Sequence, residues 1–371
     1  MKIIINILRF IVGVLFIFSG LIKANDPLGL SYKIQEFFEV WGLHQFYFLT
    51  LAFSVIMIAF EIVAGVAVIL GWKMKWFSWL LLGLIVFFTF LTGYALFSGK
   101  IRECGCFGNC IPLQANQSFI KDLVLLVMIL PIFYFRNKIT PFLSSTANLV
   151  TIIMVTIFSF AIQWYVLLHL PLFDCLPYKE GKNILKQMEP PPGSIPDSTV
   201  ISFVYNKEGK EVEFTADSFP DDFDDTRYTF VRRYDKLVRK GNAVPAIMDF
   251  SLQSLSGNDT TKALLSEEGQ KLFVFLKDGY TKEHWIERMP VLEQSLQAKA
   301  VKIFLVTNLS LQQLDPASLN MKGITVLRAD GTAIKTAARA NPTFIHVDQS
   351  TIGHKWSYAD IDDAIKYFQS K

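Results

Sequence analysis

The chain has 371 residues, too many for one ordinary domain, and its composition divides it unevenly. Five apolar stretches lie before residue 170, whereas charged residues and prolines are concentrated after it. The formal net charge of +3 is small and scattered, so nucleic acid is not an expected partner. The 33 phenylalanines, most of them in the first half, are typical of helices that face lipid.

The apolar stretches are long enough for membrane-spanning helices, which need about 20 residues each. We expect five spans, at roughly residues 3–22, 46–70, 76–98, 119–135 and 147–169. The first could be a signal peptide, but it lacks a small-x-small cleavage site and is interpreted as a retained span. Glu61 falls in the middle of the second span, where it is either a proton relay or a structural hydrogen-bonding group.

Five spans put the two termini on opposite sides of the membrane. The lysines and arginines that flank the N-terminal side are closer to the spans than those on the other side, which favours an N-terminus inside. We therefore expect a bacterial-type inner membrane protein whose C-terminal domain is extracytoplasmic. Arg9, near the inner end of the first span, is expected to extend its guanidinium to the membrane surface.

Four segments follow from the change in composition. Residues 1–175 form a transmembrane domain, 176–198 a proline-rich linker, 199–244 a β-rich preface and 245–371 an α/β domain. Within the first outer loop, residues 30–43 have apolar side chains at helical spacing, which predicts a short helix on the membrane surface.

The soluble half is predicted to contain both strands and helices. The preface should form one hairpin from residues 199–206 and 211–216 and a second within 227–241. Residues 272–276 and 302–308 are apolar enough to be buried parallel strands, with a helix between them and another at the C-terminus.

The strongest chemical signal is the segment Cys104-Gly-Cys106-Phe-Gly-Asn-Cys110, here called the cysteine loop. A bond between Cys104 and Cys106 would close a small strained ring that exchanges readily, with Cys110 as the resolving thiol. Ordinary structural disulfides are an alternative, with Cys175 as a candidate partner. A zinc or copper site is the least favoured alternative, and no metal site is predicted.

The cysteine loop and the segment FSGLIKANDPLGLSYKIQEFF, residues 18–38, resemble the membrane proteins of the DoxX and MauE group. The resemblance covers roughly residues 1–175. For MauE it implies a role in the maturation of methylamine dehydrogenase, in which many disulfides must form. A more distant similarity to the vitamin K epoxide reductase type makes a quinone a possible cofactor, although the chain has no quinone-binding signature.

Residues 245–371 resemble thioredoxin-like periplasmic domains. AIMDFSLQSLSG (246–257) is similar to the first strand and turn of such domains, LFVFLKD (272–278) to the strand before the active site, and Asn341-Pro342-Thr343 to the cis-proline loop. The CxxC motif is missing, because the segment at that position reads KDGYTKEHW (277–285). Without a thiol, this domain cannot exchange disulfides.

These observations predict membrane-bound thiol–disulfide electron transfer, or disulfide maturation of extracytoplasmic proteins, by a possible thiol–disulfide oxidoreductase. The expected partners are membrane lipid and an extracytoplasmic client protein. The alternative is a non-catalytic membrane assembly or binding subunit whose cysteines only form structural disulfides.

Overall fold

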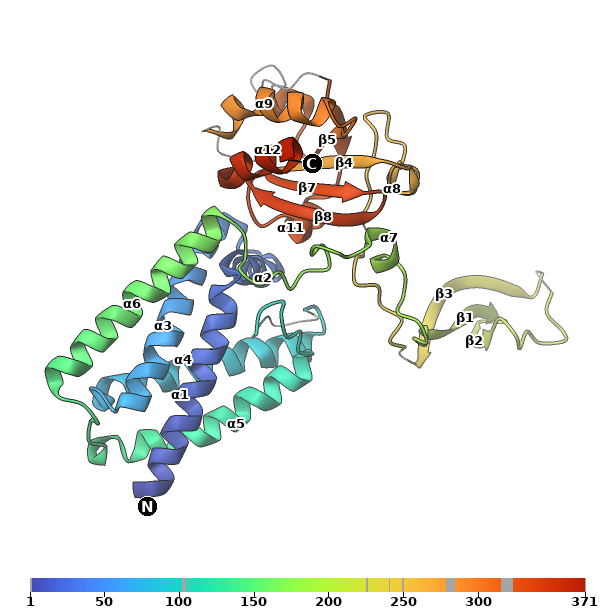
Figure 1. Cartoon of the computed structure of the whole chain (residues 1–371). Coiled ribbons are helices and arrows are strands. Elements are labelled where there is room, and N and C mark those ends of the chain that lie inside the picture. The colour runs from blue at the N-terminus through green and yellow to red at the C-terminus, as the bar shows by residue number, and fades with distance from the viewer. Residues whose placement is uncertain are drawn as a thin grey trace.

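The computed structural model describes residues 2–101, 105, 107–224, 226–239, 241–248, 250–277, 284–314 and 323–370. The first half of the chain is a bundle of long helices, and the second half is an α/β domain with a β arm that extends to one side (Figure 1). The N-terminus lies at the end of the bundle away from the α/β domain (Figure 1).

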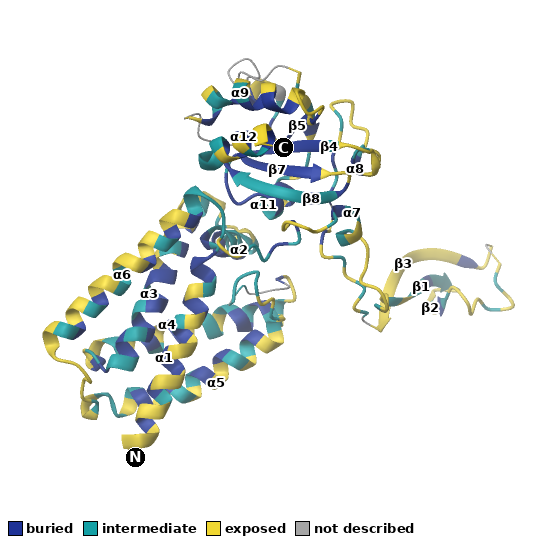
Figure 2. Cartoon of the chain, in the orientation of Figure 1, coloured by how far each residue is buried: buried dark blue, intermediate teal, exposed yellow. Residues whose placement is uncertain are grey.

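The described residues contain five helices that are long and apolar enough to cross a membrane. They are α1 (Lys2–Ala24), α3 (Thr50–Leu70), α4 (Met74–Ser98), α5 (Ala115–Tyr134) and α6 (Ser145–Leu168). Their outward sides are largely exposed (Figure 2), and this exposed surface includes large apolar side chains such as Phe97 and Val127. The protein is therefore a membrane protein with five candidate spans, as the apolar stretches predict.

Helices α1 and α3 pack closely because glycines meet at their crossing. A Cβ atom added at Gly13 would lie 2.7 Å from the carbonyl oxygen of Gly65, and one added at Gly65 would lie 2.8 Å from that of Gly13. Small residues let helix backbones approach where lipid provides no hydrophobic driving force between helices. This contact fixes the position of α3, and therefore of Glu61, relative to α1.

Arg9 stabilises the same pair of helices from inside the bundle. Its side chain donates to the carbonyl oxygens of Val68 at 3.0 Å and Ile69 at 2.9 Å, at the end of α3. The last carbonyls of a helix lack the amide partners of the following turn. Of these two, the Val68 carbonyl is also reached by the Gly71 amide, at 3.2 Å. The guanidinium therefore acts as a further cap. The prediction that Arg9 extends to the membrane surface is wrong, since the residue is buried.

The helix expected at residues 30–43 is present as α2 (Pro27–Val40). It begins earlier because the Asp26 carboxylate accepts a hydrogen bond from the Gly29 amide at 2.9 Å, and Pro27 is the first helical residue. A side-chain cap followed by proline is a strong signal for a helix N-terminus. Leu30, Ile34 and Phe37 are buried. The turn η1 (His44–Leu49) then leads into α3.

The α/β domain is built on a mixed five-stranded sheet in the order β6-β5-β4-β7-β8. Its strands are β4 (Gln270–Leu276), β5 (Lys302–Thr307), β6 (Thr325–Arg328), β7 (Thr343–Asp348) and β8 (Thr351–Ser357). β4, β5 and β6 are parallel to one another. β7 pairs antiparallel with β4, and β8 pairs antiparallel with β7. The two parallel strands predicted at 272–276 and 302–308 are confirmed.

Both faces of this sheet are covered. Leu272, Val274 and Leu276 of β4 pack with α9 (Trp285–Gln297) and α12 (Ile361–Ser370). Phe273 and Phe275 point to the opposite face, toward α8 (Thr261–Ser266) and α11 (Gly331–Ala337). The uninterrupted apolar run of β4 follows from this burial on both sides.

Some expectations for this domain are wrong. Within 246–257 the described residues form no strand, and Gln253 makes only isolated bridges, to Asp259 and to Arg328 of β6. The hydrogen bonds of this segment are too few to continue the sheet. Two further elements are not predicted from the sequence: β8, whose partly buried residues show no regular alternation, and the short helix α11.

The β arm is a three-stranded antiparallel sheet in the order β2-β1-β3. Its strands are β1 (Ser198–Lys207), β2 (Lys210–Thr215) and β3 (Tyr228–Arg239). The first predicted hairpin is confirmed. The second, within 227–241, is wrong: β3 is one continuous strand that pairs along the whole of β1. It contains no glycine, proline or asparagine at which the chain would turn.

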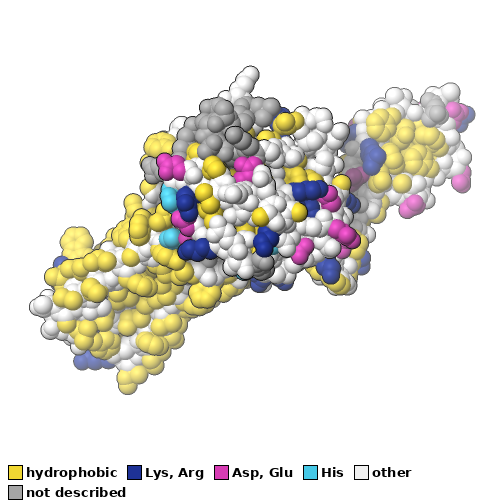
Figure 3. All heavy atoms as spheres, turned by 45° about the horizontal axis from the view of Figure 1, so that its top comes forward, with side chains coloured by type: hydrophobic (Ala, Val, Ile, Leu, Met, Phe, Trp, Pro, Cys, Tyr) yellow, Lys and Arg dark blue, Asp and Glu magenta, His cyan; other side chains and the backbone are white. Residues whose placement is uncertain are grey.

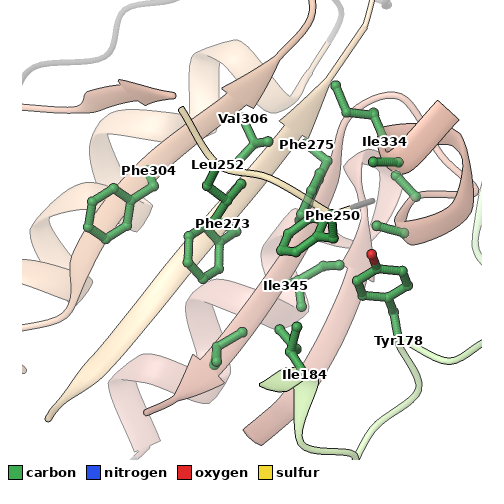
Figure 4. Packing of buried hydrophobic residues seen from close by; sticks show 14 of the residues in the cluster. Tyr178, Ile184, Phe250, Leu252, Phe273, Phe275, Phe304, Val306, Ile334 and Ile345 are labelled. Atoms are coloured by element: carbon green, nitrogen blue, oxygen red, sulfur yellow. The ribbon is translucent and has the colours of Figure 1, made fainter. Parts of the chain in front are cut away.

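The segment 176–198 does more than connect domains. Tyr178 and Ile184 are buried against the aromatic face of the α/β sheet (Figure 4). The amide of Ile184, at the start of α7 (Ile184–Gln187), donates to the carbonyl of Ser350 at 2.7 Å. After the β arm the chain returns to α7, where the Ile247 amide donates to the carbonyl of Gln187 at 2.9 Å. The β arm is therefore an insertion into the α/β domain.

Candidate functional site

The cysteine loop lies between α4 and α5 and is covalently tied to the segment after α6. Cys110 and Cys175 form a disulfide with a Cα–Cα distance of 4.8 Å. This bond gives Cys175 a partner and places the loop and the end of α6 on the same side of the bundle. Cys104 and Cys106 lie outside the described residues, so the predicted reactive pair stays a prediction, as does the resolving role of Cys110.

Noncovalent contacts also hold the cysteine loop to the bundle. The Asn109 side-chain amide donates to the Asp26 carboxylate at 3.1 Å, which joins the loop to the start of α2. The Phe107 ring lies 6.0 Å from that of Phe18 on α1, centroid to centroid. Asn25 exchanges hydrogen bonds of 2.8 and 2.9 Å with the backbone of Phe173, two residues before Cys175. Both sides of the disulfide are therefore anchored near the junction of α1 and α2.

Asp26 also joins this region to the α/β domain. The Nε atom of Arg339, which follows α11, lies 2.9 Å from both Asp26 carboxylate oxygens. The two side chains are 6% and 11% exposed, so the pair is largely shielded from water. One carboxylate thus caps α2, accepts from Asn109 and pairs with Arg339. It connects the helix, the cysteine loop and the α/β domain.

Tyr32 of α2 is the centre of a second contact with the α/β domain. Its hydroxyl accepts a hydrogen bond from Lys277 Nζ at 2.6 Å. The charged groups of Lys277, Lys335 and Arg339 lie 5.1, 5.3 and 5.5 Å from its ring centroid, within cation–π range. Lys277 directly follows β4 and begins the cysteine-free segment 277–285. The edge of the sheet at the end of β4 therefore faces α2.

Asn341 fixes the backbone of Lys277. Its side chain accepts from the Lys277 amide at 3.0 Å and donates to the Lys277 carbonyl at 3.2 Å. The Asn341–Pro342 peptide bond is cis. Residues far apart in sequence are thus brought together beside Tyr32, and this contact could not be read from the sequence.

A third set of contacts joins the end of α6 to β8 and the turn η3 (Tyr358–Asp360). His169 Nδ1 lies 2.6 Å from an Asp360 carboxylate oxygen, and Lys355 Nζ lies 2.8 Å from the Asp174 carboxylate. Burial lowers the pKa of Lys355, and the nearby Asp174 charge opposes this shift. The α/β domain is therefore held at two separate places on the bundle, at α2 and at the end of α6.

Glu61 is paired across two helices. Its carboxylate lies 2.7 Å from Nζ of Lys23 on α1, and both side chains are buried. The ammonium of Lys23 also lies 4.6 Å from the ring centroid of Phe88 on α4. This pairing supplies the interhelical bond that was one of the two predicted roles; the proton-relay role stays a prediction. A carboxylate inside a span needs a partner within the bundle, so Glu61 in the sequence already indicated a buried cation nearby.

A cavity of about 360 Å³ lies beside this ion pair. Its walls come from α1, α3, α4, α5 and the cysteine loop, through Phe107. Asp122 of α5 also lines it, accepts a hydrogen bond from Thr92 at 3.0 Å and pairs with Lys121 at 2.9 Å. Lys121 and Asp122 are not among the residues predicted from the sequence, although two adjacent charges inside an apolar span were a usable signal.

No group of three or more His, Cys, Asp or Glu side chains suited to a metal was found among the described residues. Cys104 and Cys106 lie outside the described residues, so the expectation of no metal site stays a prediction.

Comparisons with known proteins match two separate parts of the chain to two different family models. Residues 1–135 match the family model of the methylamine utilisation protein MauE, so the N-terminal membrane region is of the MauE family. This match ends at α5, before α6 and Cys175. Residues 199–240, which contain almost all of the three arm strands, match a domain of unknown function, DUF8463.

Protein TlpB of Flavobacterium psychrophilum is 28% identical to this chain over 142 residues, which are 35% of this chain and 36% of that protein. The chain therefore spans about a third of the length of the curated relative it matches.

Proposed function

We propose that this protein carries out thiol–disulfide exchange at the outer surface of a bacterial-type inner membrane, in the maturation of extracytoplasmic proteins. One observation carries the proposal. The Cys110–Cys175 disulfide uses two of the four cysteines, so the two that remain are Cys104 and Cys106, separated by one glycine. A bond within such a small ring is strained and favours exchange over a structural role.

In the proposed reaction, a client thiolate attacks the Cys104–Cys106 disulfide and forms a mixed disulfide. A second client thiol then releases the client in its oxidised form, and Cys104 and Cys106 keep the two electrons and two protons as thiols. If Cys110 resolves the mixed disulfide instead, its bond to Cys175 must open first. The membrane region's similarity to a methylamine utilisation protein family supports a client in an amine-oxidising pathway.

The α/β domain is proposed to be a thioredoxin-like domain that has lost its redox role. Support comes from the parallel β4–β5 pair and from β7, which pairs antiparallel with β4. The chain has no cysteine after Cys175. Lys277 and Arg339 hold this domain against α2, beside the cysteine loop. The domain would therefore hold a client close to that loop without exchanging disulfides itself.

The proposed orientation puts the N-terminus inside and the cysteine loop and α/β domain outside. The odd number of candidate spans supports it. The Cys110–Cys175 disulfide supports it as well, since disulfides persist in oxidising compartments.

Trapping of a client tests the proposal. In the Cys106→Ser protein, the Cys104 thiol can attack a client disulfide, which is the reverse of the release step, and no Cys106 thiol is present to resolve the product. Adducts that dithiothreitol removes should therefore appear on a non-reducing gel. The matched control is the Cys104→Ser/Cys106→Ser protein, in which these adducts should be missing. Equal adducts in both proteins, or adducts in neither, would overturn the proposal.

A second function is favoured by the anchoring of the Cys110–Cys175 disulfide at the docked α/β domain: a non-catalytic assembly subunit. In that case Cys106→Ser should trap nothing, while Cys175→Ser should weaken assembly with the partner protein.

A further inference from the structure

We infer that another cavity, at the end of the bundle away from the α/β domain, binds the phosphate headgroup of an anionic phospholipid. This cavity, here called the basic cavity, shares no lining residue with the cavity beside Glu61 and none with the cysteine loop. The proposed thiol chemistry and this binding site can therefore fail independently.

The basic cavity lies where the start of α1 meets the connection between α5 and α6. Its volume is about 210 Å³, and its polar lining residues are Lys2 and Asn6 on α1 and Lys138 and Thr140 in the connection. The Phe135 ring also lines it, and the Lys138 ammonium lies 5.6 Å from the centroid of that ring, within cation–π range. The cavity therefore has room for a headgroup, and one of its cations is held against an aromatic ring.

The polar groups of the basic cavity are suited to donate hydrogen bonds to an anion. The ammonium groups of Lys2 and Lys138 only donate, and the Thr140 hydroxyl can donate as well. The side-chain oxygen of Asn6 accepts from the Arg9 guanidinium at 3.0 Å, which leaves the NH₂ group of Asn6 to donate. The oxygens of an ionised phosphodiester only accept, so these donors match them, with lysine acting as a point charge.

Positive charge at this end of the bundle has no carboxylate to balance it. The lysines and arginines of the segments that meet here are Lys2, Arg9, Lys73, Lys75, Arg136 and Lys138. The stretches that contain them, residues 2–25, 62–102 and 123–173, include no aspartate or glutamate. In the described part of the chain, the ion pairs involve other residues. An anionic ligand would supply the missing charge, whereas a cation would add to the excess.

Exposed aromatic side chains place this end of the bundle at the depth of lipid headgroups. Trp76, near the start of α4, and Tyr134, at the end of α5, are 74% and 78% exposed. Tryptophan and tyrosine are enriched where a protein crosses the membrane–water interface. Tyr134 directly precedes Phe135 of the basic cavity, so the cavity opens at the same depth. Basic pockets between spanning helices on the cytoplasmic side are places where anionic headgroups bind.

The bundle also has a surface for the acyl chains of the lipid. Val127 and Leu130 precede Tyr134 by about two turns and one turn on the same side of α5, and both are exposed. A phospholipid can therefore bind with its phosphate in the basic cavity and its chains along α5, whereas free phosphate would gain only the polar contacts. Phosphatidylcholine should bind less well than phosphatidylglycerol, because its quaternary ammonium would bring a further positive charge to the lysines.

Native mass spectrometry of the delipidated full-length protein in detergent tests the inference. The protein is titrated separately with phosphatidylglycerol, phosphatidylcholine and sodium phosphate. We expect phosphatidylglycerol to bind about tenfold more tightly than phosphatidylcholine, and sodium phosphate at the same concentration to leave phosphatidylglycerol bound. Equal binding of the two lipids would overturn the inference. Displacement of phosphatidylglycerol by sodium phosphate at that concentration would also overturn it, since the site would then bind phosphate and not a lipid.

Two matched double variants separate the basic cavity from the general charge of this end. Lys2→Gln/Lys138→Gln removes the two cations that line the cavity and should weaken phosphatidylglycerol binding by about tenfold or more. Lys73→Gln/Lys75→Gln removes the same charge at the same end but outside the cavity, and should change binding by less than about twofold. Equal losses in the two double variants would overturn the inference, because binding would then depend on the charge of the surface and not on the cavity.

A third variant tests the space without changing the charge. Thr140→Trp fills the basic cavity at an exposed position and should weaken phosphatidylglycerol binding several-fold. Its melting temperature in detergent shows whether the protein is folded. Unchanged binding in a folded Thr140→Trp protein would overturn the inference, whereas trapping of a client by Cys106→Ser would be unaffected by either result.

Discussion

The membrane bundle and the α/β domain differ in what their charged groups contact. In the bundle, Lys23, Glu61 and Asp122 are buried among apolar helices and line a cavity. In the α/β domain, the faces of the sheet are packed with apolar side chains, and Lys277 and Arg339 lie at the edge that contacts α2. Figure 3 shows the same contrast at the surface, with hydrophobic side chains over the bundle and charged ones over the α/β domain.

This contrast separates two uses of charge. A charge within a membrane span is costly and needs compensation inside the bundle, so its presence there points to a function. A charge at the edge of a soluble domain is easily hydrated when free, so it suits a docking contact. Chemistry is therefore expected in the bundle, whereas the α/β domain is expected to position other groups.

The disulfide that ties the cysteine loop to the segment after α6 should give the largest effect on stability. The Cys110–Cys175 bond closes a loop of 65 residues in sequence separation, and restriction of the unfolded chain predicts a contribution of about 4 kcal/mol. Cys175→Ser should lower the free energy of unfolding by that amount, measured by chemical denaturation in detergent. Cys106→Ser is the control and should keep the parental melting temperature; an equal loss there would make Cys106 structural as well.

The buried ion pair of the bundle should give the next effect. Glu61→Leu leaves the Lys23 ammonium without its carboxylate, and breaking a buried pair costs about 3 kcal/mol or more. The double variant Lys23→Met/Glu61→Leu should recover most of this loss, because it removes both charges. Thermal unfolding in detergent measures the stability of the single and the double variant. If the double variant is no more stable than the single one, the pair does not account for the loss.

The docking contact should give a smaller effect. Arg339→Ala leaves the Asp26 carboxylate largely shielded and without its cation, which costs about 2 kcal/mol. The α/β domain should then detach from α2 more often, seen as faster proteolysis between α6 and β4 in the full-length protein. Arg328→Ala, on the exposed edge strand β6, is the control. Equal proteolysis of the two variants would contradict the docking role of Arg339.

The sequence predicted best what local periodicity controls. The five long apolar helices, the helix after Asp26, the first arm hairpin and the two parallel strands were all predicted. It failed where distant residues decide the structure. Nothing local to Tyr178 and Ile184 shows that they pack under a sheet formed more than 80 residues later, and nothing local to Arg9 shows that it caps α3.

For the candidate site, the sequence identified the residue types but not their pairing. Cys110, Cys175 and Glu61 were singled out from the sequence. That Cys110 bonds to Cys175, and that Glu61 pairs with Lys23 of another helix, is shown only by the structure. Lys23 lies in the last turn of α1, where a lysine commonly flanks a membrane span. The fold buries it, since α3 and α4 surround it with Glu61 and Phe88.

The smallest predicted effect is at the start of α11, in the α/β domain. The Asp330 carboxylate caps this helix by accepting from the Thr332 amide at 2.8 Å, and this hydrogen bond lowers the pKa of Asp330. Loss of such a cap costs about 1 kcal/mol, so Asp330→Ala should speed hydrogen exchange of the α11 amides at neutral pH.

A lowered carboxyl pKa means that this stability is present above the ordinary value of 3.8 and is lost as the pH falls through the pKa in the folded protein. The difference between the parental protein and Asp330→Ala, after correction for the intrinsic exchange rate, should therefore shrink below pH 3.8. Asp330→Asn is the control, because it keeps a capping oxygen without the charge and should show no such acid transition. A difference that stays constant down to pH 2 would mean that the carboxylate does not act as the cap.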